Sequence, residues 1–370
     1  MKITVILGTR PEIIKMSPVI RELERRQENY FIIHTGQHYS YNLDKVFFEQ
    51  LKLPQPKYNL EVGSGSHAEQ TGKILIGVEN VLRDEHPDIV LVEGDTNSVF
   101  AGALAATKLH IKVGHVEAGL RSYDRNMPEE INRVLTDHCS DYLFAPTEKA
   151  KTILLGEGIS EEKIFATGNT IVDAVYQNLE IARRTCKLDV MPAASNTEHK
   201  PLNLEPRNYF LVTLHRQENV DNGARLASIL DGLDRVAIEF SLPVIYPIHP
   251  RSRKMMNHFK LDRGHVALVE PLDFLRFLHL ESNARLILTD SGGVQEESCI
   301  LRVPCVTLRD NTERPETLEV GSNILAGSVP DKILECTQMM LARENQWRNP
   351  FGDGKAGRRI TKIIMEATHD

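Results

Sequence analysis

The sequence lacks the features that place a protein in a membrane or in an oxidising compartment. Its 370 residues include only five cysteines, an odd number without C-x-x-C spacing, which favours reduced thiols over a disulfide framework. No apolar run approaches the ~18 residues of a membrane span, and no signal peptide is recognisable at the start. We therefore expect a cytoplasmic protein without a membrane partner.

An excess of basic charge is also missing. The chain carries 44 Lys and Arg against 51 Asp and Glu, a formal net charge of −7. Proteins that bind nucleic acids in general need a basic surface to displace counterions. We expect no nucleic-acid partner, and any anionic ligand must be held by local groups.

Three common cofactor patterns are absent as well. The turn after the first apolar run is not G-x-G-x-x-G, so the usual NAD fingerprint is missing. No G-x-x-x-x-G-K-[ST] occurs, which argues against a P-loop nucleotide hydrolase. No two histidines lie at metal-ligand spacing beside a carboxylate. We expect neither a cofactor nor a metal.

Short apolar runs alternate with helical patterns along most of the chain. Ile3–Gly8 is typical of a buried parallel strand, and Pro11 suits the first turn of the helix that follows. A second such series begins near Tyr209, after a polar, proline-bearing stretch at 186–207. Strict alternation predicts an α/β fold with two doubly wound, Rossmann-like parallel sheets in series. The remaining expected strands are 31–36, 89–94, 112–116, 142–145, 164–167, 244–248, 266–269, 286–289 and 305–308.

A glycine-marked turn in the second series has the pattern of a phosphate site. The expected strand 286–289 ends in Asp290, and Ser291-Gly292-Gly293 turns the chain into a helix whose free N–H groups and dipole favour an anion. Glu297 lies one turn further on, within reach of sugar hydroxyls, and Arg314 is a planar donor suited to phosphate. A tight strand-to-helix turn, a solvated Glu297 and a surface arginine are the structural alternative.

Three acids in the first series lie where expected secondary structure breaks. Asp95 and Glu117 follow two apolar strands, and Glu129 begins a helix after Pro128. Acids delivered from several strand ends favour proton transfer on a bound substrate. The alternatives are a helix N-cap for Asp95 and an i,i+4 pair of Glu129 with Arg133.

Basic and imidazole side chains lie at corresponding strand ends. Arg10 and Lys15 flank the turn after the first strand, where both can face the carboxyl edge of the sheet. His215 ends the first strand of the second series, and His249 ends the next. A strand-end imidazole suits a general acid or a donor to a leaving phosphate; a satisfied junction histidine is the alternative.

Together these motifs closely resemble the non-hydrolysing UDP-N-acetylglucosamine 2-epimerases. The matches occur in order from residue 3 to about 327. They are Gly8-Thr-Arg-Pro-Glu12 with Lys15, Glu93-Gly-Asp-Thr96, His115-Val-Glu-Ala-Gly-Leu-Arg121, Met127-Pro-Glu-Glu-Ile-Asn-Arg133, Thr167-Gly-Asn-Thr170, His215-Arg-Gln-Glu-Asn219, Asp290-Ser-Gly-Gly-Val-Gln-Glu-Glu297 and Thr312-Glu-Arg-Pro-Glu316.

The resemblance implies a GT-B fold, with two Rossmann-like domains and a ligand cleft between them. We expect an amino-terminal domain at 1–170 that includes a last helix at about 355–370, and a UDP-binding domain at 171–354. A homodimer is implied, as is a possible second UDP-GlcNAc that acts as an activator at Gln37-His-Tyr39.

The family pattern also implies roles for the candidate residues. Asp95, Glu117 and Glu129 would transfer protons around the sugar, with His215 near the diphosphate. The substrate-binding residues would be Arg10 and Phe277 near the uracil, Ser291, Gly292 and Gly293 at the diphosphate, Glu297 at the ribose, and Lys15, Arg133, His249 and Arg314 elsewhere on the ligand.

The implied reaction converts UDP-GlcNAc to UDP-ManNAc at carbon 2 by elimination and re-addition of UDP, through a 2-acetamidoglucal. Its product would supply cell-surface polysaccharide or glycoconjugate synthesis. Three alternatives stay open: a GT-B glycosyltransferase that uses a UDP-sugar, a hydrolysing epimerase, and a nucleotide-sugar sensor without turnover. An assay with UDP-GlcNAc alone separates them by product.

Overall fold

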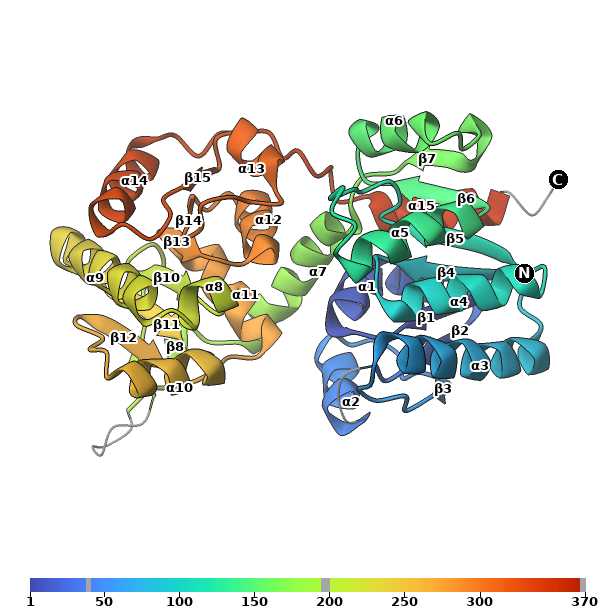
Figure 1. The fold of residues 1–370 in the computed structure, drawn as a ribbon, viewed down its shortest axis with the longest axis horizontal. Coiled ribbons are helices and arrows are strands. Elements are labelled where there is room, and N and C mark those ends of the chain that lie inside the picture. Colours follow the sequence, from blue (N-terminus) through green and yellow to red (C-terminus); the bar gives the residue numbers. More distant parts are fainter. Residues whose placement is uncertain (38–40, 194–199, 367–370) are drawn as a thin grey trace. The chain divides into compact units, whose positions relative to one another are not determined.

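The computed structural model describes residues 1–37, 41–193 and 200–366, with the backbone alone at 41–44 (Figure 1). The chain divides into two compact units. The amino-terminal unit is Met1–Gln177 together with Phe351–Asp370, and the carboxyl-terminal unit is Asn178–Pro350. Each unit contains a parallel sheet with helices between successive strands, as the alternating sequence pattern predicts.

In the described part of the amino-terminal unit, seven parallel strands form one sheet in the order β3-β2-β1-β4-β5-β6-β7. The strands are β1 (Lys2–Leu7), β2 (Asn29–His34), β3 (Tyr58–Asn59), β4 (Ile89–Glu93), β5 (Lys112–Val116), β6 (Tyr142–Ala145) and β7 (Ile164–Ala166). The helices are α1 (Arg10–Arg26), α2 (Tyr41–Gln50), α3 (His67–Glu85), α4 (Asn97–Lys108), α5 (Pro128–Cys139), α6 (Glu148–Gly156) and α15 (Ala356–Glu366), and α7 (Thr170–Thr185) begins in this unit and ends in the other.

The order of this sheet reverses between β1 and β4. The chain runs outward from β1 to β3, returns to the centre, and then continues from β4 to β7. The loops after β1 and β4 therefore lead away from each other at the carboxyl edge. In open parallel sheets, such a switch point is where ligands bind. Gly8 follows β1 and Asp95 lies in the loop after β4.

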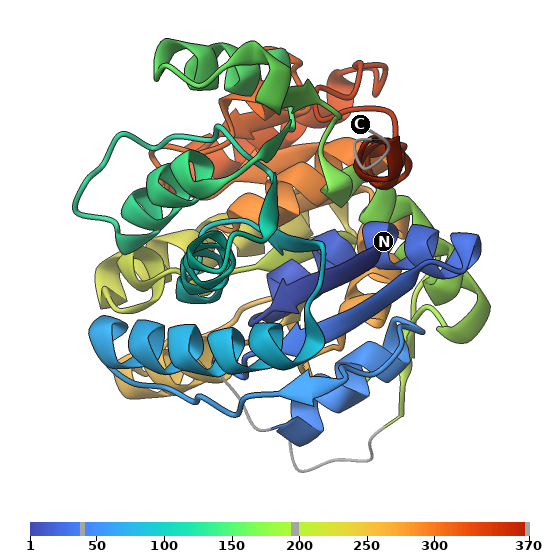
Figure 2. The same ribbon diagram turned by 90° about the vertical axis from the view of Figure 1, so that its right-hand side faces the viewer.

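The last helix of the chain, α15, packs against the first helix, α1 (Figures 1 and 2, dark red). A Cβ at Gly357 would lie only 2.9 Å from both C and Cβ of Pro18, so glycine allows the two helices this approach. The carboxylate of Asp173, in α7, accepts hydrogen bonds from the N–H groups of Ala356 and Gly357, each at 3.1 Å. It thereby satisfies two of the free donors at the start of α15.

In the described part of the carboxyl-terminal unit, six parallel strands form a sheet in the order β12-β11-β10-β13-β14-β15. The strands are β10 (Phe210–Thr213), β11 (Val244–Pro247), β12 (Val266–Val269), β13 (Leu286–Thr289), β14 (Cys305–Thr307) and β15 (Asn323–Leu325), and a small antiparallel pair joins β8 (Asp189–Val190) to β9 (Leu202–Asn203). The helices are α8 (Gln217–Val220), α9 (Gly223–Phe240), α10 (Pro250–Phe259), α11 (Phe274–Asn283), α12 (Gly292–Leu301), α13 (Pro315–Glu319) and α14 (Pro330–Ala342).

Alternate residues of its strands fill cores on the two faces of this sheet. Phe210 and Val212 belong to the core that includes residues of α9 and α14, whereas Leu211 belongs to the core that includes residues of α11 and α12. Successive side chains of a strand point to opposite faces, so a strand with helices on both faces must be apolar at every position. This is why these strands are uninterrupted apolar runs. The order reverses here between β10 and β13, which gives the unit its own switch point.

The two-residue strands at the edges are the elements that the sequence pattern did not predict. β3 pairs only Tyr58 and Asn59 with β2, and β8 and β9 pair two residues each. Strand β15 was also missed, because its three residues form no long apolar run.

We expect Asp173→Ala to lower the free energy of unfolding by about 1–3 kcal/mol, because two buried N–H groups lose their acceptor. Urea unfolding would measure the change. The matched control is Asp353→Ala, which removes an ion pair with Arg359 whose side chains are 44% and 49% exposed. The control should lose less than about 1 kcal/mol. Equal losses in the two variants would contradict the role of Asp173 in holding α15.

Candidate functional site

The switch point of the amino-terminal unit is closed by a buried acid, Glu12. Its carboxylate accepts hydrogen bonds from Gly8 N at 2.6 Å, Thr9 Oγ1 at 2.9 Å and Thr96 Oγ1 at 2.7 Å. Glu12 therefore ties the loop after β1 to the loop after β4, which carries Asp95. Burial raises the pKa of Glu12 to about 7, although the three hydrogen bonds oppose the rise.

Glu117 follows β5 and pairs with Lys15 of α1. Lys15 Nζ lies 2.5 Å from Glu117 Oε2, and both side chains are largely buried. The backbone of Glu117 has φ of 69°, a left-handed conformation that residues other than glycine rarely adopt. Strain of this kind persists when the surroundings determine it, and it concentrates at functional sites. The sequence placed both residues at the sheet edge, and the structure brings them into contact.

Asp95 is held by Arg133 of α5. The guanidinium of Arg133 binds Asp95 Oδ2, and its Nη1 lies 2.6 Å from Glu130 Oε2. Glu130 in turn accepts hydrogen bonds from the N–H groups of Ser122 and Tyr123. This network links the loop after β4, the loop after β5 and the first turns of α5.

Two structural alternatives from the sequence are wrong. The N-cap of α4 is Thr96, whose Oγ1 accepts from Val99 N, and not Asp95. Arg133 pairs with Glu130, three residues before it, rather than with Glu129. Asp95 therefore does not cap α4, and Glu129 does not form the i,i+4 pair with Arg133. Glu129 is half-buried in the first turn of α5.

Beneath Glu117 lies a buried network built around Asp137 of α5. Asp137 Oδ1 is 2.6 Å from His115 Nδ1, and Oδ2 accepts from Gly119 N at 3.2 Å and lies 2.7 Å from Arg121 Nη2. Burial alone would raise the pKa of Asp137, but His115 and Arg121 outweigh it, so that the pKa lies below its ordinary value. The network fixes the backbone on both sides of Glu117.

The switch point of the carboxyl-terminal unit is also closed by a buried acid, Asp290. Its Oδ2 accepts from His215 N at 3.0 Å, Arg216 N at 2.9 Å and Asn219 Nδ2 at 3.1 Å, and Oδ1 lies 3.0 Å from His215 Nδ1. Burial disfavours the carboxylate, but His215 and the N–H donors outweigh it and keep the pKa of Asp290 below its ordinary value. The imidazole of His215 is 44% exposed and is oriented by this acid.

The start of α12, next to Asp290, carries two consecutive glycines. Ser291 is the N-cap, and its Oγ accepts from Val294 N at 3.5 Å. A Cβ at Gly292 would meet only Glu313 Oε2 at 3.7 Å, and one at Gly293 only Ser291 Oγ at 3.9 Å. Neither glycine has a positive φ. A left-handed turn therefore does not explain the two glycines, and the N–H groups at the start of a helix suit an anion.

Glu297, one turn into α12, faces a second buried acid. Glu281 of α11 is fully buried, and no other group in the described part of the chain donates a hydrogen bond to its carboxyl oxygens. Burial, and then the nearby Glu297, raise the pKa of Glu281 well above its ordinary value. Burial also raises the pKa of Glu297 to about 7, although a hydrogen bond from Glu281 opposes this rise. A neutral Glu281 that donates to Glu297 fits both shifts.

The other candidates of this unit have local partners. Arg314 Nε lies 2.8 Å from Glu296 Oε1. Phe277, a residue of α11, is partly buried against the core that includes residues of α11 and α12. His249 is the N-cap of α10 and accepts from Arg251 N at 3.2 Å, and its ring centre lies 6.2 Å from that of His215. Burial, and then His215 and Arg251, lower the pKa of His249.

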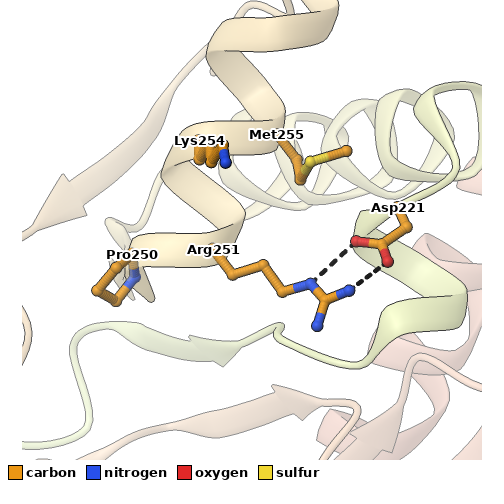
Figure 3. A pocket seen from close by; sticks show the side chains of 5 residues that line it. All are labelled: Asp221, Pro250, Arg251, Lys254 and Met255. Atoms are coloured by element: carbon orange, nitrogen blue, oxygen red, sulfur yellow. Dashed lines mark hydrogen bonds and ion pairs between the residues drawn. The ribbon is translucent and has the colours of Figure 1, made fainter.

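An open pocket of about 660 Å³ lies beside the first turn of α10 (Figure 3). Arg251 crosses it and binds both carboxylate oxygens of Asp221, with Nε 3.0 Å from Oδ1. Asp221 ends α8, which begins two residues after His215. The ion pair therefore ties the segment that carries His249 to the segment that carries His215.

The remaining candidate positions, Arg10 and the expected activator segment, have few described contacts. Arg10 begins α1, is exposed, and lies 5.6 Å from the ring centre of Phe47. Gln37 is buried and accepts from Ser98 Oγ at 2.7 Å, while residues 38 and 39 of the expected activator segment lie outside the described residues. Where the structure is described, no group of three or more His, Cys, Asp or Glu is placed to hold a metal ion. Over the same residues, no helix is long and apolar enough to cross a membrane.

Sequence reasoning missed the acids behind the site, namely Glu12, Glu93, Asp137 and Glu281. Glu93 was visible as the charged end of an apolar run, and Glu12 as an acid four residues after Gly8. Asp137 and Glu281 lie within ordinary amphipathic helices, and no sequence pattern marked them as buried acids.

Comparison with known proteins shows the family. The family described as UDP-N-acetylglucosamine 2-epimerase matches residues 21–365. This chain belongs to that family. It is 58% identical to the UDP-N-acetylglucosamine 2-epimerase of Methanocaldococcus jannaschii over 98% of this chain and 99% of the relative. It is 41% identical to the UDP-2,3-diacetamido-2,3-dideoxy-D-glucuronate 2-epimerase of Pseudomonas aeruginosa, over 99% and 100%.

A solved structure of a family member matches both units. The Methanocaldococcus jannaschii UDP-GlcNAc 2-epimerase in complex with UDP-GlcNAc and UDP has a TM-score of 0.81 and 56% identity, over 99% of this chain and 100% of that chain. The expected fold class, two Rossmann-like parallel-sheet domains of the GT-B type, is confirmed.

We expect Asp290→Asn to lower the free energy of unfolding by about 1.5–3 kcal/mol at neutral pH, because charged hydrogen bonds are lost. The folded-state pKa of Asp290 lies below its ordinary 3.8. Its contribution is therefore complete above about pH 4 and is lost as the pH falls through the folded value. Urea unfolding of both proteins from pH 7 to pH 3 measures the difference, which should shrink with acidification.

Asp221→Asn is the matched control for that series, because its ion pair with Arg251 is about two-fifths exposed. It should cost less than about 1 kcal/mol. A difference between wild type and Asp290→Asn that stays constant or grows as the pH falls would contradict the assignment.

Proposed function

We propose that this protein interconverts UDP-GlcNAc and UDP-ManNAc at carbon 2, by elimination and re-addition of UDP through a 2-acetamidoglucal and without net hydrolysis. The observation that carries the proposal is the pair of carboxylates after β4 and β5, each held by its own cation. Asp95 is bound by Arg133 and Glu117 by Lys15. Each cation holds its carboxylate in a fixed place after the strand, and a positioned carboxylate is a suitable group for proton transfer.

The carboxyl-terminal unit supplies the complementary chemistry for the nucleotide. The start of α12 offers N–H groups to the diphosphate, and Glu297 lies one turn further on for the ribose hydroxyls. Asp290 orients His215 at Nδ1 and leaves the other ring nitrogen for the leaving diphosphate. Donors aimed at the oxygens that gain charge stabilise the transition state for loss of UDP.

The steps balance without an oxidant or reductant. One carboxylate removes the proton at carbon 2 while the bond from carbon 1 to the diphosphate breaks, so the electron pair of the C–H bond forms the double bond of the glucal. UDP then adds back at carbon 1, and a proton reaches carbon 2 from the opposite face. Two faces require two differently placed acids, and Asp95, Glu117 and Glu129 provide three candidates. Each positioned acid or base typically contributes ~10²–10⁴-fold.

The proposal extends to the setting of the enzyme. We assign it to the cytoplasm as a homodimer, and its product to the synthesis of cell-surface polysaccharides or glycoconjugates. A second UDP-GlcNAc as activator belongs to the same proposal. The location rests on the cysteine pattern and the lack of a recognisable signal peptide, and the other points rest on the family resemblance.

A second substrate has a specific observation in its favour. The 41% identical relative from Pseudomonas aeruginosa is named for UDP-2,3-diacetamido-2,3-dideoxy-D-glucuronate. Identity to the relative named for UDP-N-acetylglucosamine is higher, at 58%, which favours UDP-GlcNAc. Comparison of kcat/KM for the two nucleotide sugars decides between them.

We expect UDP-GlcNAc alone, in deuterium oxide, to yield UDP-ManNAc with deuterium at carbon 2, because the proton that returns comes from an exchangeable acid. NMR of the product measures both outcomes. Release of free ManNAc and UDP would instead identify a hydrolysing enzyme. Product without deuterium would rule out proton exchange, and no product without an added acceptor would favour a glycosyltransferase.

We expect Asp95→Asn and Glu117→Gln to lower kcat by at least ~10²-fold while UDP still binds, because each removes an acid or base but leaves the nucleotide site intact. Turnover by coupled assay and UDP affinity by calorimetry check the two parts. Glu148→Gln, an exposed acid in the first turn of α6, is the control. Near-normal turnover in both site variants would remove these residues from the chemistry.

A further inference from the structure

A buried acid without a defined role lies behind the Lys15–Glu117 pair. Glu93 is the last residue of β4, and only 2% of it is exposed. Its Oε1 lies 3.4 Å from Lys15 Nζ, whereas Glu117 Oε2 lies 2.5 Å from the same nitrogen. The contact with Glu93 is an ion pair without a hydrogen bond, and among the described residues Glu93 Oε1 has no hydrogen-bond partner. One ammonium thus faces two carboxyl groups at unequal distances.

Three other acids and one lysine interact with Glu93. Glu12 lies on α1, Asp95 in the loop after β4, and Glu117 in the loop after β5, and Lys15 of α1 is the cation among these groups. Burial raises the pKa of Glu93 well above its ordinary value; Lys15 opposes the rise, and Glu117, Glu12 and Asp95 add to it. A buried anion with a single shared cation is strongly disfavoured.

We propose that Glu93 is a positioning residue for Glu117: it carries a proton at neutral pH and thereby leaves the charge of Lys15 to Glu117. The inference rests on the proposed function in one respect, since it assumes that Glu117 transfers a proton to or from the sugar. An ionised Glu93 would draw Lys15 away from Glu117 and weaken the contact that keeps Glu117 an anion. The two carboxyls that share Lys15 titrate as a coupled pair, in which one proton resides on the inner member.

This arrangement has a consequence for the pH dependence of the reaction. As the pH rises through the folded-state pKa of Glu93, the inner carboxyl ionises and competes for Lys15. The active form is therefore lost at high pH, and kcat/KM acquires an upper limb. A side chain of the same shape that never ionises removes this limb. A carboxylate on a shorter stem keeps it.

The test compares pH profiles of kcat/KM for wild type, Glu93→Gln and Glu93→Asp. We expect Glu93→Gln to retain turnover and to shift the upper midpoint to higher pH by at least about one unit, while Glu93→Asp retains an upper limb. If Glu93 had a purely structural role, kcat/KM would fall in both variants and the pH of the upper midpoint would stay unchanged. A profile of Glu93→Gln that superimposes on wild type, or a loss of ~10²-fold at every pH, overturns the proposal.

A second measurement reads the proton directly and does not depend on turnover. In protein labelled with ¹³C at the glutamate carboxyl carbon, wild type should show a resonance that titrates above about pH 6 and that is missing in Glu93→Gln. Glu12→Gln is the matched control, since Glu12 is a buried acid at the same switch point whose pKa is also raised. That variant should lose a different resonance.

These two measurements separate the possible failures. If wild type does not epimerise UDP-GlcNAc, the proposed function fails, and the carboxyl resonance still decides whether Glu93 holds a proton. If Glu93→Gln does not fold, the resonances lost in Glu12→Gln, Glu281→Gln and Glu297→Gln are subtracted from the wild-type spectrum. If a glutamate resonance that titrates above about pH 6 then remains, the proposal is supported. If no such resonance remains, the proposal is wrong.

Discussion

The need to keep anionic side chains together at the end of a buried sheet governs the amino-terminal unit. Four carboxyl groups (Glu12, Glu93, Asp95 and Glu117) lie near the carboxyl ends of β1, β4 and β5, where Lys15 and Arg133 are the paired cations. Charges removed from water are costly unless they are paired and hydrogen-bonded. The structure meets this cost in three ways: hydrogen-bond donors around Glu12, cations for Asp95 and Glu117, and burial that favours a proton on Glu93.

The two units solve the same geometric problem in the same way. At each switch point a buried acid ties together the loops that diverge there: Glu12 binds Gly8 and Thr96, and Asp290 binds His215 and Arg216. A carboxylate can accept hydrogen bonds from several donors at once, so one side chain can join two loops that leave the sheet in opposite directions. The loops that carry the candidate ligand-binding residues are therefore positioned by Glu12 and Asp290, which are not themselves candidates for binding the ligand.

The sequence predicted the strands and the positions of the candidate residues because continuous apolar runs mark parallel strands, and their last residues mark the sheet edge. It did not predict which side chains pair, since Lys15 and Glu117 are 102 positions apart and only the fold brings them together. Local ambiguity caused the two errors. Asp95 and Thr96 are both good N-caps, and consecutive acids at 129 and 130 both lie within one turn of Arg133. The polar edge strand β3 had no apolar run to reveal it.

Each unit also places a buried acid behind the acid that is expected to face the ligand, and the difference between the two arrangements matches the expected chemistry. In the amino-terminal unit, the ammonium of Lys15 faces both Glu93 and Glu117 and lies closer to Glu117, the outer acid. In the described part of the carboxyl-terminal unit, the side chains that shift the pKa values of Glu281 and Glu297 are themselves carboxyls, and burial raises the pKa of Glu297 to about 7. A carboxyl with that pKa can accept a hydrogen bond from one ribose hydroxyl or donate to another, which suits recognition rather than catalysis. A single lysine therefore accounts for the different behaviour of two otherwise similar pairs of acids.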